Sequence, residues 1–477
     1  MLFNSLDFYL FFPIVTTLYF LLPHAWRWFL LLVASCFFYM VFIPKYILIL
    51  FVTITVDFIA GRLIEKTSPG RLRRLTLVGS LAVTIALLGF FKYFNFANDN
   101  IASVARFFHW NYGIGSLKII LPLGLSFHTF QSMSYVIEVY RGNQKAERHY
   151  GIFALYVMFY PQLVAGPIER PQHLLHQFRE QHTFDYERVT GGLKRMAFGL
   201  FKKVVIADQL ALLVDQVYSH PHDYTGFPLM LATICFAYQI YCDFSGYSDI
   251  ALGAAQVMGF RLMENFDRPY TARSIAEFWR RWHVSLTSWF RDYVYIPLGG
   301  NRVAKPRWYM NILVTFLVSG LWHGANWTFI MWGALNGMYL LLSLWTAPLR
   351  EAVVRATGLQ GHPRLHHALQ VGVTFLLISF AWIFFRANSM DDAVYIISHL
   401  FDGFTGLARR GRFAFNGFVL FFILFVEYIH HIHRTSGTGN LFNGRPVLVR
   451  WSLYYLMMTT IVIFGSYSEQ RFIYFQF

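Results

Sequence analysis

Residues 3–22 read FNSLDFYLFFPIVTTLYFLL, an apolar run that is long enough to cross a bilayer as one helix. About 20 predominantly apolar residues are sufficient for one crossing. The run lacks the positively charged start of a secretory signal peptide, and it contains Asp7 and Pro13. We therefore expect a retained transmembrane helix here rather than a cleaved signal.

Similar apolar runs recur along the whole chain. Of the 477 residues, 56% are hydrophobic and only 14% are charged, whereas soluble domains usually carry about 25% charged residues. No polar linker divides the chain, so we predict one domain over residues 1–477. The composition indicates an all-α polytopic membrane protein with about 11 transmembrane helices. The expected spans are 3–22, 26–43, 45–61, 75–94, 117–140, 195–218, 226–258, 309–345, 366–387, 413–430 and 451–467. Each of the two long ones, 226–258 and 309–345, is either two helices or one tilted and broken helix.

The net charge of +15 comes from basic residues that lie between the spans. Arg71, Arg73 and Arg74 follow the third span, and residues 261–307 contain far more Arg and Lys than Asp and Glu. Because cytoplasmic loops are enriched in these residues, both regions are expected in the cytoplasm and the N-terminus outside it. No basic stripe lies on a soluble domain, which argues against nucleic acid as a partner. The expected partner of the apolar surface is membrane lipid.

Three segments do not fit simple spans. The stretch 150–168 has basic residues on both sides, so we predict a re-entrant segment that enters the membrane and returns. Residues 274–295 place apolar side chains at helical spacing, with Arg280, Arg281 and Arg291 on the same helix. This pattern is typical of one helix lying at the membrane interface. Residues 391–404 show a weaker form of it.

His323 is the first catalytic candidate, within the stretch SGLWHGANW at 319–327. A helix that starts near Tyr309 would place it ~20 Å from the cytoplasmic end, at ~1.5 Å per residue. Gly320 and Gly324 leave room beside it, and Asn326 would share its helical face and could bind the imidazole or an oxyanion. A buried histidine that pairs with a neighbouring helix remains the alternative.

His283 is the second candidate, on the expected interfacial helix, where it could act as an acid or base or merely anchor the helix. Asp243 and Asp249 lie six residues apart in an apolar region, so they do not share a helical face. We expect Gly246 to break or bend the helix between them. The carboxylates would then orient histidines or pair with arginines. His128, inside a span, is expected to be hydrogen-bonded core rather than a pathway residue.

The sequence contains no recognisable metal site. Cys36, Cys235 and Cys242 lack ligand spacing and predict neither zinc binding nor a disulfide framework. The cluster His430, His431 and His433 has no carboxylate at ligand spacing. Neither a metal nor a tightly bound cofactor is therefore expected.

Five motifs occur in an order that resembles the membrane-bound O-acyltransferase (MBOAT) family, in particular its bacterial alginate O-acetyltransferase (AlgI-like) branch. They are PQLVAGPIER at 161–170, DFSGYSD at 243–249, EFWRRWH at 277–283, RDYVYIPLGGNR at 291–302 and LWHGAN at 321–326. The resemblance implies a ring of tilted helices around a central tunnel. His323 and His283 match the two histidines of the family. Many relatives carry a further histidine where this chain has Asn336, so no proton transfer is assigned to that position.

The resemblance also implies a function. An acetyl group from a cytoplasmic donor, expected to be acetyl-CoA, would pass across the bacterial inner membrane for O-acetylation of an exopolysaccharide such as alginate. A periplasmic SGNH-type acetyltransferase or another protein of a polysaccharide complex would be the partner. Four arginines are candidates for binding the coenzyme A phosphates, namely Arg280, Arg281, Arg291 and Arg302.

Two other classes of function stay open at this point. A transporter or flippase for a lipid-linked saccharide would explain the many spans, but it predicts inverted repeats, and the sequence has no evident repeat. A non-catalytic scaffold of a polysaccharide synthesis complex predicts that His323 is dispensable.

Overall fold

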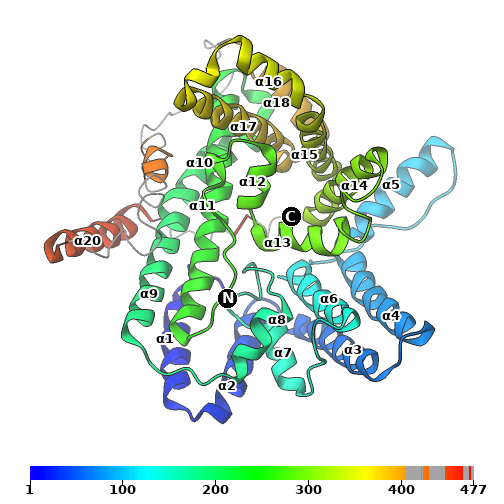
Figure 1. The fold of residues 1–477 in the computed structure, drawn as a ribbon, viewed down its shortest axis with the longest axis vertical. Helices are drawn as coiled ribbons and strands as arrows, with labels where there is room; N and C mark the ends of the chain where they lie inside the picture. Colours follow the sequence, from blue (N-terminus) through cyan, green and yellow to red (C-terminus); the bar gives the residue numbers. More distant parts are fainter. Residues whose placement is uncertain (404–420, 422, 429–445, 466–471, 474–477) are drawn as a thin grey trace. The chain divides into compact units, whose positions relative to one another are not determined.

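The computed structural model describes residues 1–403, 421, 423–428, 446–465 and 472–473 (Figure 1). In this part of the chain every regular element is a helix and no strand occurs, which confirms the all-α prediction. Length and composition qualify six described helices as membrane-spanning: Pro44–Lys66, Arg71–Phe107, Phe227–Met258, Trp327–Trp345, Pro363–Arg386 and Val447–Phe464. The expectation of about 11 spans around a tunnel stays a prediction.

The chain forms two compact units. Unit 1 comprises Met1–Met196 and Ser248–Glu264, and unit 2 comprises Ala197–Tyr247 and Asn265–Phe477. Each unit therefore contains a short segment from the other half of the sequence. The expectation of one domain over the whole chain stays a prediction.

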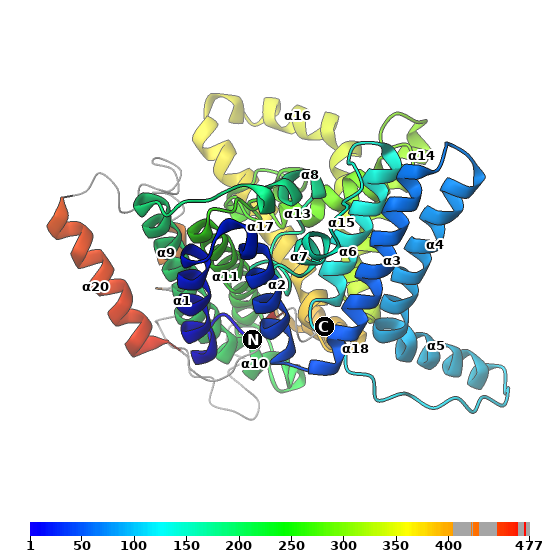
Figure 2. The same cartoon turned by 90° about the horizontal axis from the view of Figure 1, so that it is seen from below.

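Unit 1 is a helical assembly that includes a buried carboxylate. Its helices are α1 (Leu6–Leu21), α2 (His24–Met40), α3 (Ile47–Lys66), α4 (Arg71–Leu88), α5 (Phe94–Phe107), α6 (Leu125–Arg141), α7 (Tyr150–Met158) and α8 (Pro171–Leu174), followed by the start of α9 (Tyr186–Phe201). Helix α3 packs against α4 and α6 (Figure 2). Ser80 of α4 and Ser132 of α6 both donate hydrogen bonds to Asp57 of α3, which is 1% exposed. Polar side chains thus join the three helices, as is common between membrane helices.

Helix α7 is too short to cross a membrane. Its nine residues rise ~13 Å, against ~30 Å of hydrocarbon. After Met158 the chain continues in turns, and residues 152–169 are buried throughout. The carbonyl of Tyr156 accepts hydrogen bonds from Gln131 Nε2 at 2.5 Å and Gln162 Nε2 at 2.7 Å. The segment is thus short and covered by protein, as irregular backbone at membrane depth must be. The re-entrant course itself stays a prediction.

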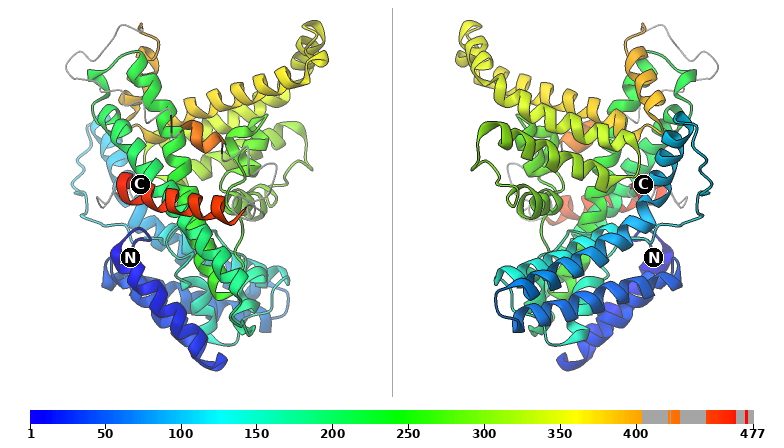
Figure 3. Two further views of the ribbon diagram at one scale, coloured as in Figure 1. Left: turned by 90° about the vertical axis from the view of Figure 1, so that its left-hand side faces the viewer. Right: turned by 90° about the vertical axis from the view of Figure 1, so that its right-hand side faces the viewer.

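Unit 2 contains most of the longest α-helix of the described chain. Its elements are the end of α9, a π-helical turn (Lys202–Ala207), α10 (Asp208–Tyr218), most of α11 (Phe227–Met258), α12 (Ile275–Arg281), α13 (Val284–Phe290), α14 (Lys305–His323), α15 (Trp327–Trp345), α16 (Ala347–Ala356), α17 (Pro363–Arg386), α18 (Met390–His399) and α20 (Val447–Phe464). Helix α17 packs along α15 (Figure 3). The expected span 413–430 and the cluster at His430, His431 and His433 lie largely outside the described residues.

The predicted span 309–345 consists of two helices that form a hairpin, which decides between the two forms left open by the sequence. Helix α14 ends at His323, and Gly324 continues in extended conformation with φ −160°. A β-carbon on Gly320 would lie 2.3 Å from the carbonyl oxygen of Phe329, and one on Gly333 would lie 2.3 Å from that of Phe316. The glycines therefore allow the backbones of α14 and α15 to touch.

The structure contradicts the expectation that Gly246 breaks its helix. Helix α11 runs without interruption through its 32 residues. A β-carbon at Gly246 would lie 2.7 Å from the carbonyl oxygen of Gly199 in α9. This glycine thus provides space for a neighbouring helix rather than a bend.

The expected interfacial helix at 274–295 is divided in two. His283 adopts the left-handed conformation, with φ 43° and ψ 56°, and separates α12 from α13. A π-helical turn from Arg291 to Tyr295 follows. Arg280 and Arg281 therefore belong to α12 and do not share a helix with Arg291, which corrects the prediction. Left-handed conformation is uncommon outside glycine and is held by surrounding structure.

Candidate active site

His323 is the last residue of α14 and lies inside an aromatic enclosure of unit 2. Its side chain is buried, and three rings surround the imidazole edge-on. The ring centroids of Trp322, Trp332 and Phe385 are 4.9, 5.0 and 5.3 Å from that of His323. They come from α14, α15 and α17, so the hairpin and α17 together fix the position of the imidazole.

A second layer of contacts holds these rings. Trp332 stacks on Trp382 with centroids 5.8 Å apart. The indole of Trp382 donates a hydrogen bond to the Tyr270 hydroxyl at 3.1 Å, and this hydroxyl donates to the carbonyl of Ala237 at 2.6 Å. The indole orientation is therefore set by a buried hydrogen-bond chain that ends on α11. Buried networks of this kind make a site rigid when each member has a partner.

Asn326 does not share a helical face with His323, which corrects the prediction. It is the N-cap of α15, where its Oδ1 accepts a hydrogen bond from the Thr328 N–H at 3.1 Å. Its Nδ2 donates to the carbonyl of Asn388 at 3.2 Å. The residue thus closes the hairpin, because an N-cap satisfies a backbone donor that the helix leaves unpaired.

His283 is buried beside a phenylalanine of α11. Its ring centroid lies 4.6 Å from that of Phe244, in an edge-on arrangement. Burial lowers the pKa of His283 to about 3, so the imidazole is neutral at pH 7. The preceding Trp282 lies 5.1 Å from Trp382. Trp382 therefore contacts both Trp282, next to His283, and Trp332, which packs against His323.

The two carboxylates of the DFSGYSD motif form separate ion pairs. In unit 1, Asp249 accepts a hydrogen bond from Arg195 at 3.0 Å, and this pairing with an arginine was expected. In unit 2, Asp243 lies 2.7 Å from Lys203 and accepts a hydrogen bond from the Ile473 N–H at 2.7 Å. Asp243 is thus paired with a lysine rather than an arginine.

Sequence reasoning missed the buried charges opposite Asp243. Lys203 also binds Asp208 at 2.7 Å, and all three side chains are at most 7% exposed. Lys203 lies in the π-helical turn Lys202–Ala207, an element that often occurs at functional sites. The signal was available, since the predicted span 195–218 contains Lys202, Lys203 and Asp208, and charges within a span are rarely incidental.

His128 was predicted to be a hydrogen-bonded core residue, and the structure confirms its burial but not the hydrogen bond. It is 1% exposed in α6, and neither ring nitrogen has a hydrogen-bond partner among the described residues. The residue belongs to unit 1.

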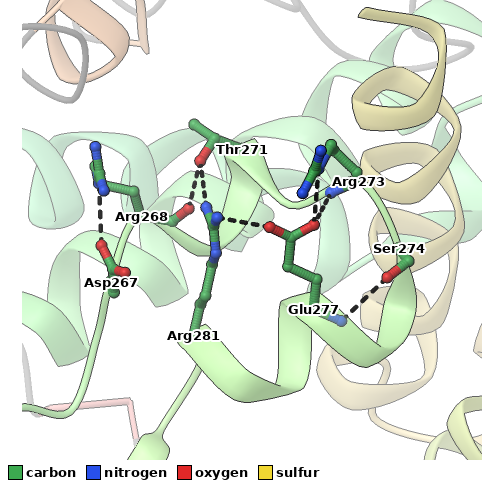
Figure 4. A network of polar contacts seen from close by, with 7 residues as sticks. All are labelled: Asp267, Arg268, Thr271, Arg273, Ser274, Glu277 and Arg281. Carbon is green, nitrogen blue, oxygen red and sulfur yellow. Dashed lines mark hydrogen bonds and ion pairs between the residues drawn. The ribbon is translucent and has the colours of Figure 1, made fainter. Parts of the chain in front are cut away.

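The four candidate arginines fall into two groups. Arg281 is engaged in the network of Figure 4, where it binds Glu277 at 2.6 Å and the Thr271 hydroxyl at 2.9 Å. Arg291 binds the neighbouring Asp292 at 2.8 Å. Arg280 and Arg302 are exposed.

The network of Figure 4 also explains how α12 begins. The hydroxyl of Ser274 accepts a hydrogen bond from the Glu277 N–H at 3.2 Å, while Glu277 accepts one from the Arg273 N–H at 2.8 Å. This reciprocal arrangement closely resembles a capping box. Arg281 is therefore part of the structure that starts the helix.

Comparison with known proteins decides the family. The model of the "MBOAT, membrane-bound O-acyltransferase family" matches residues 149–387. The "Probable alginate O-acetylase AlgI" of Pseudomonas putida is 41% identical over 409 residues, which cover 84% of this chain and 80% of the relative. The chain belongs to the membrane-bound O-acyltransferase family. It is therefore an O-acyltransferase, which favours the enzyme over the transporter and the scaffold.

Other relatives have names that refer to different polymers. The "Peptidoglycan O-acetyltransferase" of Helicobacter pylori is 35% identical over 403 residues, covering 79% of this chain and 73% of the relative. The "Teichoic acid D-alanyltransferase" of Streptococcus thermophilus is 28% identical over 297 residues, covering 58% and 71%. The matched region of this O-acyltransferase, 149–387, includes His283, the α14–α15 hairpin and the aromatic enclosure.

Proposed function

We propose that this O-acyltransferase takes an acetyl group from acetyl-CoA on the cytoplasmic side and passes it across the membrane for O-acetylation of an exported polysaccharide. The names of the relatives support a polysaccharide acceptor, since two relatives with 41% and 40% identity are named probable alginate O-acetylases. Alginate is accordingly the first acceptor to test. The proposed location is a bacterial inner membrane, with the N-terminus in the periplasm.

The observation that carries the proposal is the placement of His323. An imidazole at the end of a helix, held by three rings and largely screened from water, is oriented before any substrate arrives. Fixed geometry of a base relative to a hydroxyl is a main source of rate enhancement. His283, neutral and buried on the neighbouring segment, supplies a second imidazole.

The reaction is an ester exchange. A hydroxyl oxygen attacks the thioester carbonyl, the C–S bond breaks, and an ester C–O bond forms. His323 accepts the hydroxyl proton, which finally reaches the thiolate and yields coenzyme A thiol. Alternatively, the imidazole of His323 receives the acetyl group first and relays it to the acceptor. Both routes need a neutral imidazole at this position.

The donor is proposed to bind on the basic face that includes α12 and the loop before α14. Arg280 and Arg302 are exposed there and can pair with phosphates. Arg281 and Arg291 would have to exchange their carboxylate partners for a phosphate. A periplasmic SGNH-type acetyltransferase is the proposed partner for the final transfer to the polymer.

The test measures acetyl transfer from labelled acetyl-CoA by the purified protein in membrane vesicles. We expect His323→Ala to reduce turnover by about a hundredfold or more, the typical contribution of a positioned acid–base group. Arg307→Ala, at the start of the same helix, is the matched control and should retain turnover. A His323→Ala protein with normal elution on size-exclusion chromatography and unchanged turnover would remove His323 from the mechanism.

A further inference from the structure

A helix continues past the end of a membrane span in unit 1. Helix α4 has 18 residues and rises ~27 Å, close to the ~30 Å thickness of the hydrocarbon core. The candidate span that contains it, Arg71–Phe107, has 37 residues, which would measure ~55 Å if straight. Helix α5 therefore lies beyond the length that one crossing requires.

The change of direction occurs at a π-helical turn. Residues Gly89–Tyr93 adopt this conformation between α4 and α5. Figure 2 shows α5 leaving the line of α4 and pointing away from the other helices of unit 1. π-Helical turns are a recognised cause of such bends. Arg71, Arg73 and Arg74 lie at one end of α4, and α5 continues from the other end.

The chain returns along one face of α5. The side chain of Asn95 forms two hydrogen bonds with the backbone of Leu117, at 2.8 and 2.9 Å. The Tyr112 hydroxyl donates to Asn98 Oδ1 at 2.6 Å. We call residues 94–120, helix plus returning segment, the arm. These hydrogen bonds hold its two halves together.

The opposite face of α5 is apolar and exposed. Residues 97, 101, 104 and 108 follow each other at intervals of four, three and four, and therefore lie on one side of the helix. Their side chains are Ala, Ile, Val and Phe, and Ile101 and Val104 are 52% and 51% exposed. At the tip, the ring of Phe108 stacks on that of Trp110 with centroids 5.1 Å apart.

We propose that the arm lies in the lipid interface on the side of the membrane away from Arg71, with the apolar face of α5 buried among acyl chains. The face continues a helix of which only 17% of the most apolar window is buried inside the protein, so lipid already surrounds that helix. Amphipathic helices lie in this manner at membrane surfaces, where tryptophan is enriched.

The experiment uses the full-length chain with Cys36, Cys235 and Cys242 replaced by alanine and one new cysteine carrying the fluorophore NBD. Ile101→Cys and Val104→Cys report on the apolar face. Ser103→Cys, which is exposed and contacts Asp99 and Arg106 on the polar side of α5, is the matched control. The proteins are reconstituted into vesicles of phosphatidylethanolamine and phosphatidylglycerol, and fluorescence is quenched by brominated lipid or by iodide present on both sides.

We expect brominated lipid to quench labels at 101 and 104 several-fold more than the label at 103, and iodide to show the reverse order. Equal iodide quenching at all three positions would mean that the arm stands in water, and this overturns the proposal. Protection of 101 and 104 from both quenchers would mean that protein covers the face, which overturns it as well. Size-exclusion chromatography of each labelled variant verifies that it is folded.

Discussion

His323 and Lys203 show how single residues in an apolar chain acquire their roles. Uncharged aromatic rings from three helices enclose His323, and their packing fixes the orientation of its imidazole. Lys203 is fixed by charge instead, with Asp208 and Asp243 each 2.7 Å away. Both side chains are removed from water, so each depends on its immediate partners.

The Lys203 cluster gives the first prediction. Lys203→Met leaves two buried carboxylates without their cation, and breaking a buried ion pair in this way costs about 3–5 kcal/mol. We expect a clear fall in the midpoint of thermal unfolding, followed in detergent by intrinsic fluorescence. Lys305→Met, at an exposed lysine, should leave the midpoint unchanged. The triple variant that adds Asp208→Asn and Asp243→Asn should recover part of the loss; no recovery would contradict the assignment.

The Glu169–His173 pair gives a prediction for pH. His173 Nδ1 lies 2.6 Å from Glu169, and its hydrogen bond to this carboxylate raises the pKa of His173 above 6.5. A raised pKa in the folded state means that the stabilising contribution is present below pH 6.5 and is lost as the pH rises through the folded pKa.

The measurement compares the parent protein with His173→Gln, which does not titrate. The parent should have the higher midpoint of thermal unfolding near pH 6, and the difference should shrink near pH 9. A difference that stays constant or grows with pH would contradict the proposed charge pairing.

At the scale of elements, the α14–α15 hairpin decides where His323 lies. The break after His323 depends on Gly324 and on the Asn326 cap, and the close contact of the helices depends on Gly320 and Gly333. A straight helix through this region would have placed Asn326 beside His323. The hairpin instead places Trp332 of α15 against the imidazole.

Glycine substitutions test this arrangement. Gly320→Ala introduces a β-carbon 2.3 Å from a backbone oxygen, so we expect separation of α14 and α15, a lower midpoint of thermal unfolding and reduced acetyl transfer. Gly372→Ala, in α17, meets nothing within 4 Å and serves as the control. It should be neutral or slightly stabilising, since alanine favours helix over glycine by about 1 kcal/mol. Equal behaviour of the two variants would refute the packing argument.

At the scale of the molecule, the distribution of basic residues sets the proposed orientation. The turn before α4 carries Arg71, Arg73 and Arg74, whereas the arm after it carries few charges. Transmembrane proteins keep such basic turns in the cytoplasm. The arm, the N-terminus and the acceptor side would then all face the periplasm.

Cysteine labelling tests the orientation. Ser68→Cys, exposed before α4, should resist a membrane-impermeant maleimide in intact cells and react after lysis. Ser103→Cys, on the polar side of the arm, should react in intact cells once the outer membrane is permeabilised. Reversed reactivity of the two positions would invert the proposed topology and place the acceptor on the wrong side.

Much of the architecture followed from the sequence, because apolar runs in lipid have few alternatives to helix. The runs at 3–22, 26–43 and 366–387 correspond to α1, α2 and α17 within a few residues. The motifs identified the family, and the comparisons confirmed it. Local breaks were harder to predict. Gly246 was expected to interrupt its helix and does not, whereas α14 ends directly before Gly324, where no break was predicted.

The sequence by itself determined that this protein is a helical membrane protein, because that follows from the hydropathy of its apolar runs. It also determined the family, because the family motifs are local in the chain. Only the tertiary structure decided which side chains surround His323 and which charges face Asp243. Those neighbours come from α15, α17 and the π-helical turn before α10, distant segments that helix packing brings together. The sequence does not distinguish a glycine at a turn from a glycine at a contact between two helices. Only the position of the neighbouring backbone distinguishes these two roles.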